Sequence, residues 1–235
     1  MGHLSRVFTI AGIVASSFGV IWVWSKTSDV FHPSTGQAAM ATPNVAMVSK
    51  AISTTGLQQK RQQVKAAEPL VQNGDLILRT GSDLTSDILR QFSATDKTYS
   101  HCGIAAIENG KVVVYHSIGG EDNPDAKLRR ESFEQFCNPA NNLGFGIFRY
   151  DLSPAQLQAV DSLARVYYTQ QVPFDMGFSL DSDDRFYCAE FVYKTVNRIA
   201  GKDYIKPTVH QGFTFVAAGN LYQNGHAQNI CKINF

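Results

Sequence analysis

The strongest constraint on the fold lies at residues 101–117, where two apolar runs flank Asn109 and Gly110. Asn-Gly is favoured in two-residue hairpin turns because both residues adopt a positive φ at low cost. The runs HCGIAAI (101–107) and KVVVYHS (111–117) are therefore expected to pair as antiparallel strands.

Successive side chains of a strand point to opposite faces, so the second run divides its residues between two faces. Val112, Val114 and His116 are expected to share one face, and the residues between them the other. The tight turn also places residue 101 opposite residues 116–118. His101 and His116 are therefore expected to meet on one face of the hairpin.

The remaining segments predict a sheet combined with helices. The expected elements are a strand at 74–80, a helix at 82–92 capped by Ser82, a charged loop at 121–130, a strand at 145–150, a helix from Ser153-Pro154 to about Tyr168, and a helix at 188–199. Leu84, Ile88 and Leu89 are expected on one face of the first helix, and Phe213 and Phe215 are expected to complete the core. This order predicts an α+β fold with an antiparallel sheet.

The composition permits a real core and argues against one class of partner. The chain has 235 residues, 44% of them hydrophobic and 17% charged, with a net charge of +1. It contains no basic stripe and no long run of one charge, so nucleic-acid binding has no support.

Residues 7–24, VFTIAGIVASSFGVIWVW, contain no charged residue. A helix of that length spans about 27 Å, close to the hydrocarbon thickness of a bilayer. The segment predicts an uncleaved membrane anchor, with Trp22 and Trp24 at the interface. A cleaved signal peptide is the alternative, although the Ala39-Met40-Ala41 stretch lies far beyond the apolar run. A buried core helix is disfavoured, because nothing polar interrupts the run.

These patterns predict three parts of the chain. Residues 1–26 form the anchor or signal segment, and residues 27–68 form a linker rich in Ser, Thr, Gln, Ala and Pro, either flexible or partly helical around 46–65. Residues 69–235 form the folded domain, which carries every candidate functional residue. We expect the domain to face the periplasm or exterior of a bacterial cell envelope.

Cys188 lies where the apolar, helix-like stretch of RFYCAEFVYKTVNRIAG begins. The nucleophilic form of cysteine is the thiolate, whose formation is favoured at a helix amino terminus and beside an imidazolium. With His101 and His116 on the hairpin, the sequence indicates a cysteine nucleophile, a base that takes its proton and a second imidazole that orients the base. For a single histidine in a strand, a hydrogen-bonded structural role is the simpler interpretation.

Two further residues flank Cys188. Glu190 lies in the first turn of the predicted helix, where it either binds backbone amides or a substrate amine, or simply complements the helix dipole. Tyr187 either supports a developing oxyanion or packs as an aromatic side chain.

The other cysteines predict no metal or redox motif. No CxxC pair occurs, and the spacing of His101, His116 and Cys188 matches no common zinc motif, so no metal and no cofactor is expected. Cys102 is expected to be a buried, small apolar residue. Cys137 and Cys231 are either unpaired or, in an exported domain, joined in a disulfide.

Three motifs in order, GDLILRTG, YSHCGIA and RFYCAEFV, resemble the permuted NlpC/P60 papain-like cysteine hydrolases of the YiiX/YebB type, relatives of the lecithin–retinol acyltransferase group. The resemblance covers roughly residues 72–205. It implies a circularly permuted papain-like domain, because histidine here precedes cysteine. By position, it implies that Cys188 is the nucleophile and His101 the base.

The third polar position of this family falls on the second hairpin strand. Many YiiX-type members carry Glu there, whereas this chain has His116, which is similar to the acyltransferase side of the group. Glu190 matches an acidic residue that often follows the cysteine in YiiX-type sequences.

We therefore expect a membrane-anchored cysteine hydrolase that cleaves an amide or ester through an acyl-enzyme. One candidate substrate is a peptidoglycan peptide; the alternative is a lipid acyl group, which the enzyme would hydrolyse or transfer. An interpretation of another class is a non-catalytic envelope module that binds peptide or lipid.

Overall fold

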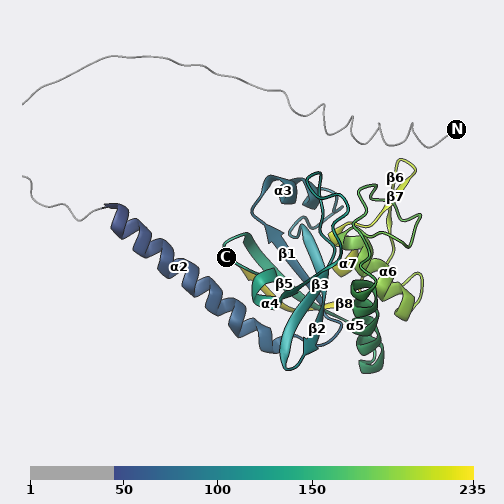
Figure 1. Ribbon diagram of the computed structural model, residues 1–235, viewed down its shortest axis with the longest axis horizontal. Helices are drawn as coiled ribbons and strands as arrows, with labels where there is room; N and C mark the ends of the chain where they lie inside the picture. The colour runs from purple at the N-terminus through teal and green to yellow at the C-terminus, as the bar shows by residue number, and fades with distance from the viewer. Residues whose placement is uncertain (1–44) are drawn as a thin grey trace, which may run out of the picture. The chain divides into compact units, whose positions relative to one another are not determined.

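Six antiparallel strands form the central sheet of the protein in the computed structural model, which describes residues 45–235 (Figure 1). The strand order is β4-β3-β2-β1-β5-β8. The strands are β1 (Leu76–Gly81), β2 (His101–Glu108), β3 (Lys111–His116), β4 (Arg129–Ser132), β5 (Asn142–Tyr150) and β8 (Ala227–Asn234). This confirms an α+β fold with an antiparallel sheet.

The central hairpin is formed by β2 and β3, as predicted. Asn109 and Gly110 have φ values of 51° and 75°, and Glu108 pairs with Lys111. The division of β3 between two faces is also confirmed, because Val112 and Val114 lie in one buried cluster while the intervening residues lie in another.

Helices cover both faces of the sheet (Figure 1). Helices α5 (Pro154–Thr169) and α6 (Cys188–Ala200) pack on one face. The last turns of α2 (Val45–Ala67) and the short α4 (Phe133–Phe136) pack on the other. A short 3-10 turn (Glu68–Leu70) connects α2 to β1, and α7 (Ala218–Tyr222) precedes β8. We refer to the two sides of the sheet as the α5–α6 face and the α2–α4 face.

Helix α5 begins as the sequence predicts. The Ser153 hydroxyl accepts a hydrogen bond from the Gln156 backbone amide, and the Gln156 side-chain oxygen accepts one from the Ser153 backbone amide. Pro154 occupies the first turn. This reciprocal pair of bonds, a capping box, satisfies backbone amides that otherwise lack partners at the start of a helix. Proline costs no hydrogen bond in the first turn, because an N–H at that position has no acceptor within the helix.

Helix α3 (Leu84–Arg90) departs from the prediction in its cap and in its buried face. Asp83 rather than Ser82 caps it, by accepting a hydrogen bond from the Ser86 amide at 2.9 Å. Leu84 and Ile88, two of the residues expected to share one face of the helix, are 65% and 38% exposed. The apolar spacing identified the helix correctly but not the side that faces the sheet, because no other element covers this stripe.

The carboxyl-terminal region also differs from expectation. Phe213 and Phe215 do not complete the core; they lie in a two-stranded hairpin of β6 (Thr208–His210) and β7 (Phe213–Phe215), where Phe213 is 40% exposed. The sheet instead ends on β8, which the sequence did not reveal because a bulge opposite Ile147 interrupts its two-residue period. The predicted loop at 121–130 ends inside β4.

The folded unit begins before the predicted boundary at residue 69. Helix α2 confirms the partly helical interpretation of residues 46–65, and the compact unit runs from Lys50 to Phe235. Val64 and Ala67 are 2% and 3% exposed, so the last turns of α2 belong to the core. Within residues 45–235, no helix is long and apolar enough to cross a membrane; the predicted anchor at 7–24 lies outside that range.

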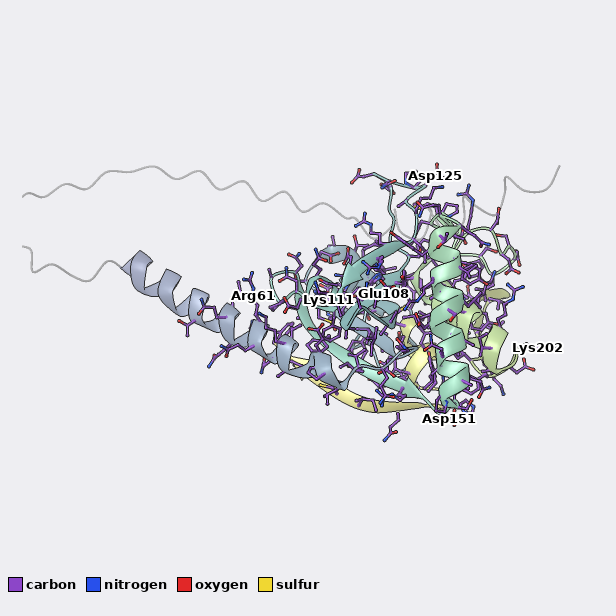
Figure 2. The ribbon with its side chains drawn as sticks, turned by 60° about the horizontal axis from the view of Figure 1, so that its bottom comes forward. Arg61, Glu108, Lys111, Asp125, Asp151 and Lys202 are labelled. Carbon is purple, nitrogen blue, oxygen red and sulfur yellow. The ribbon has the colours of Figure 1, made fainter. Side chains whose placement is uncertain are left out.

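Glu108 lies at the end of β2 (Figure 2) and connects this strand to three other elements. Its carboxylate pairs with Arg130 of β4 and with Arg165 of α5, the latter at 2.8 Å, and accepts a hydrogen bond from the Tyr115 hydroxyl of β3. Strand β4 lies at an edge of the sheet, so this network fixes its position relative to the hairpin.

Candidate active site

The two predicted histidines meet in the structure. His101 Nε2 lies 2.9 Å from His116 Nδ1, and the ring planes are nearly perpendicular. The two residues are 7% and 0% exposed. A Cβ at Gly103 would lie 2.5 Å from Val114 Cγ1 and 3.1 Å from His116 Cβ, so glycine is what allows His116 to pack here. The predicted meeting of the two imidazoles is therefore confirmed.

Phe136 of α4 supports both imidazoles from the α2–α4 face. Its ring centroid lies 5.6 Å from that of His101 and 5.1 Å from that of His116. Arg79 of β1, which pairs across the sheet with His101, places its guanidinium carbon 4.8 Å from the same phenyl centroid and donates to the Phe136 carbonyl. One fully buried ring thus holds two imidazoles and a cation in place.

Both histidines favour the neutral state. Burial lowers the pKa of His101 well below its usual value, and the positive charge of Arg79 lowers it further. Burial also lowers the pKa of His116, although the carboxylate of Glu131 partly offsets that effect. A neutral imidazole has one donor and one acceptor nitrogen, so this pair is able to accept a proton at neutral pH.

Cys188 is the first residue of α6 and is partly buried. A hydrogen bond from the Cys102 thiol, the backbone amides of the first turn and the charge of Arg79 lower the pKa of Cys188, against the opposing effect of burial. Burial raises the pKa of the other three cysteines, Cys102, Cys137 and Cys231. Cys188 is therefore the most readily ionised thiol in the part of the chain that the structure describes.

The sulfur of Cys188 and the ring of His101 approach the start of β2 from different sides. Cys188 packs against the cluster on the α5–α6 face, beside Cys102, whereas His101 packs with Phe136 on the other face. Arg79 acts on both groups. Among the hydrogen bonds of residues 45–235, none joins this sulfur to His101, and none engages His101 Nδ1.

Tyr187 and Glu190 hold the start of α6. The Tyr187 amide donates to Glu190 Oε2 at 3.1 Å, and the Tyr187 hydroxyl accepts from the Val216 amide at 2.8 Å. The other oxygen of Glu190 lies 3.0 Å from Lys194 Nζ. Glu190 is fully buried, and of its two predicted roles the structure shows the binding of a backbone amide.

Burial raises the pKa of Glu190 to about 7, against the opposing effects of Lys194 and the Tyr187 amide. At pH values between the usual carboxyl pKa and 7, the Glu190 carboxyl is protonated in the folded state but ionised in the unfolded state. The stability that this proton contributes is therefore present at low pH and is lost as the pH rises towards 7. We expect Glu190→Gln to remove this pH dependence. Between pH 5 and 7, the free energy of unfolding of the variant should therefore rise relative to that of the native chain, by up to about 1.4 kcal/mol per pH unit.

The check is urea unfolding of both proteins at several pH values, with exposed Glu121→Gln as the matched control. Parallel stability curves for Glu190→Gln and the native chain would contradict the expectation.

Three residues of this region escaped the sequence interpretation: Arg79, Glu131 and Phe136. Arg79 lies two residues after Ile77 in LILRT, so both side chains are on one face of the strand. Arg79 also pairs with His101 across the sheet, and the two therefore share a face. Glu131 lies in a charged four-residue edge strand, which has no apolar pattern to reveal it.

Cys102 is buried as predicted, but it also contacts the candidate nucleophile. Of the alternatives for Cys137 and Cys231, the structure shows free thiols.

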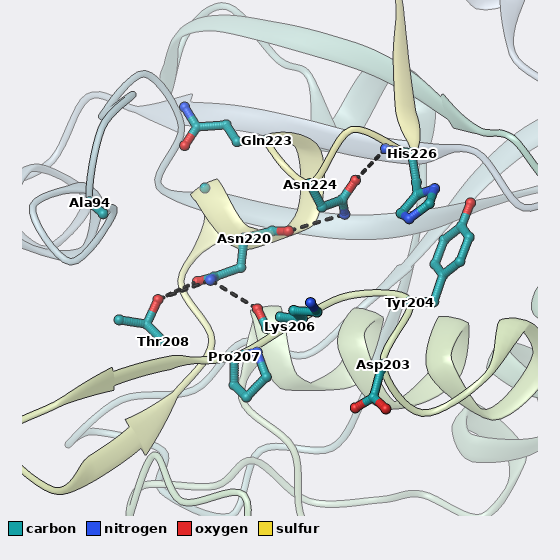
Figure 3. Close-up of a pocket in the computed structure, with 11 residues that line it drawn as sticks. Ala94, Asp203, Tyr204, Lys206, Pro207, Thr208, Asn220, Gln223, Asn224 and His226 are labelled. Atoms are coloured by element: carbon teal, nitrogen blue, oxygen red, sulfur yellow. Dashed lines mark hydrogen bonds between the residues drawn. The ribbon is translucent and has the colours of Figure 1, made fainter.

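A separate polar cavity of about 380 Å³ lies between α7 and residues 203–208 (Figure 3). None of the candidate catalytic residues lines it. Its amides are already paired, since Asn220 binds Thr208 and the Lys206 carbonyl, and Asn224 binds Asn220. This cavity therefore lacks the reactive groups present at the start of β2.

Comparisons with known proteins place this fold. No protein-family model matches the chain. The uncharacterised protein YiiX of Escherichia coli (strain K12) is 29% identical over 132 residues, which are 55% of this chain and 59% of that protein. The crystal structure of the metalloprotein yiiX from Escherichia coli O157:H7, a DUF1105 protein, is similar with a TM-score of 0.58 and 21% identity, covering 70% of this chain and 98% of that one.

The chain is thus similar to YiiX in sequence and in fold. The structural likeness shows the fold: an α+β domain with an antiparallel sheet. The sequence alignment spans less than two thirds of the relative's own length.

Proposed function

We propose that this protein is a cysteine hydrolase that cleaves an amide or ester through an acyl-enzyme. The observations that carry the proposal are the buried pair of neutral imidazoles, His101 Nε2 to His116 Nδ1 at 2.9 Å, and the thiol of lowered pKa at the start of α6. Cys102, which contacts the sulfur of Cys188, directly follows His101 in β2. A nucleophile, a base and a group that orients the base are the parts that thiol acyl transfer requires.

In this proposal the Cys188 thiolate attacks the acyl carbon of the substrate. His101 takes the thiol proton at Nδ1, the ring nitrogen without a described partner, and later donates it to the leaving group. His116 accepts a hydrogen bond from His101 Nε2–H and stabilises the imidazolium. The acyl-enzyme then reacts with water or another acceptor, which restores the thiol.

We also propose that the α+β fold is a circularly permuted papain-like domain. The order of the histidine strand and the cysteine helix supports a circularly permuted papain-like domain, and the similarity to YiiX agrees with the motifs that suggest it. Residues 7–24 would then anchor the domain at a membrane of the bacterial cell envelope.

The description of yiiX as a metalloprotein calls for a test of metal binding here. Within residues 45–235, no group of three or more His, Cys, Asp or Glu side chains is placed to hold a metal ion. The facing nitrogens of His101 and His116 are engaged with each other. These donors do not fit a metal centre, so no step of the proposed reaction passes through one.

A lipid acyl substrate is the second candidate, supported by an exposed apolar surface. Leu84, Ile88 and Phe92 follow a four-residue spacing along α3 and the turn after it, and they are 65%, 38% and 51% exposed. Phe92 contacts Phe215 of the β6–β7 hairpin. The Val216 amide next to that hairpin binds Tyr187, the neighbour of Cys188, so the surface adjoins the candidate site.

Products identify the substrate class. The full-length protein in detergent is incubated separately with muropeptides and with phospholipids, and mass spectrometry identifies what is cleaved. Cleavage of a peptide amide supports the amidase, and release of a fatty acid or its transfer to an acceptor supports the lipid enzyme. An unchanged mass in both mixtures, together with sluggish labelling of Cys188, favours the non-catalytic binding module.

Thiol labelling tests the nucleophile without a known substrate. At pH 7, iodoacetamide is expected to modify Cys188 at least about ten times faster than the three other cysteines, because only its pKa is lowered. The His101→Ala variant is expected to slow that labelling if the imidazole takes the proton, and peptide mass mapping provides the measurement. Equal rates at all four positions would contradict the prediction.

A further inference from the structure

His116 has a second ring nitrogen that the proposed chemistry leaves unused. Its Nε2 is fully buried and makes no hydrogen bond with any described residue. Glu131 Oε2 lies 3.6 Å from it, which is an ion-pair distance but longer than a hydrogen bond. A buried nitrogen without a partner carries an energetic cost, so this gap calls for a functional explanation.

Glu131 lies on β4 immediately beside the histidine strand. In the ladder between β3 and β4, Val114 pairs with Glu131 and His116 pairs with Arg129. The Glu131 carboxylate is about a quarter exposed, which leaves it room to rotate, and the interaction with His116 is the largest cause that lowers its pKa. A movement of about half an ångström would close the contact, as catalytic hydrogen bonds often do when substrate binds.

The tautomers of the two imidazoles follow from that contact. A carboxylate accepts but does not donate, so His116 must carry its proton on Nε2 to bind Glu131. Nδ1 of His116 is then an acceptor, and it accepts a hydrogen bond from His101 Nε2–H across the observed 2.9 Å contact. Nδ1 of His101 is left with a lone pair, which is the state that a base for Cys188 requires.

We propose that Glu131 is a positioning residue that fixes the tautomers of His116 and His101 so that His101 Nδ1 is the basic nitrogen. This rests on the proposed cysteine chemistry and extends it from three residues to four. The role depends on the carboxylate oxygen as an acceptor and on its place in β4, which Arg130 and Glu108 secure.

The other charged groups around His116 do not supply such an acceptor. Arg79 of β1 and Arg129 of β4 both lower its pKa as cations, and His101 of β2 occupies its other nitrogen. Phe136 of α4 contributes only an aromatic face. Glu131 is the carboxylate that raises the pKa of His116.

Two variants separate the acceptor from its charge. Glu131→Leu removes the acceptor, and Glu131→Gln keeps an oxygen at the same place without the charge. We expect Glu131→Leu to lower kcat about tenfold or more with little change in KM, and Glu131→Gln to recover most of it. The assay is release of nitrophenolate from p-nitrophenyl acetate by the full-length protein. Glu134→Leu, a half-exposed carboxylate on α4, is the matched control.

Nitrogen-15 NMR of the histidine side chains provides a reading that is independent of turnover. In the native protein at pH 8, His116 Nε2 is expected to be protonated and Nδ1 unprotonated; in Glu131→Leu the two tautomers are expected to mix. A native His116 protonated on Nδ1, or an unchanged kcat in a folded Glu131→Leu variant, would overturn the proposal. Failure of the proposed hydrolase function gives a different result. In that case the native protein itself would not react with the ester, whichever tautomers its histidines adopt.

Discussion

The Cys188→Ser variant is expected to lose at least about 10³-fold in its reaction with p-nitrophenyl acetate. A serine hydroxyl is far less acidic than a thiol whose pKa is already lowered by Cys102, the first-turn amides and Arg79. Removing the nucleophile from a set of groups that act together forfeits most of the catalytic effect. The measurement is nitrophenolate release by the full-length protein, supported by intact-mass detection of the acetyl-enzyme.

Cys231→Ser is the matched control, because Cys231 is a partly buried thiol on β8 whose pKa is raised. It is expected to react at the native rate and to form the same acyl-enzyme. Equal loss in both variants, or acylation of Cys188→Ser at the native rate, would remove Cys188 from the role of nucleophile.

The Phe136→Ala variant is expected to destabilise the protein by about 3–5 kcal/mol. Phe136 is fully buried, and truncating a buried phenylalanine loses its burial energy and leaves a cavity. This site cannot collapse easily, because two imidazoles and the guanidinium of Arg79 rest on the ring. Urea unfolding of the native chain and the variant at pH 7.5 provides the measurement.

The same substitution at an exposed ring serves as the control. Phe92→Ala removes a side chain that is 51% exposed, and we expect it to cost less than about 1 kcal/mol. A cost for Phe136→Ala as small as that of the control would show that this ring does not support the histidines.

The sequence predicted the elements in which local chemistry and long-range packing agree. Asn109-Gly110 determined a hairpin and its register, and this register brought His101 to His116. Ser153 and Pro154 determined where α5 begins. Each of these signals acts within a few residues of the chain, so no knowledge of the tertiary fold was needed.

Other features depend on neighbours that are distant in the sequence. The stripe of Leu84 and Ile88 has the spacing of a buried face but no element covers it, and β8 becomes a strand because it pairs with β5 through a bulge. Glu131 acquires its place beside His116 only when β4 joins β3. In the candidate site, residue types and faces could therefore be predicted, whereas the surroundings supplied by Glu131 and Phe136 could not.

The short strand β4 has a further consequence because, among the described residues 45–235, it forms one edge of the sheet. Border strands expose backbone groups to which another polypeptide can add, and proteins commonly prevent this with charged side chains and short length. Consecutive Arg129, Arg130 and Glu131 give β4 both protections over only four residues. Two of these charges, Arg129 and Glu131, also act on His116, so the same short strand serves both the candidate site and the protection of the sheet edge.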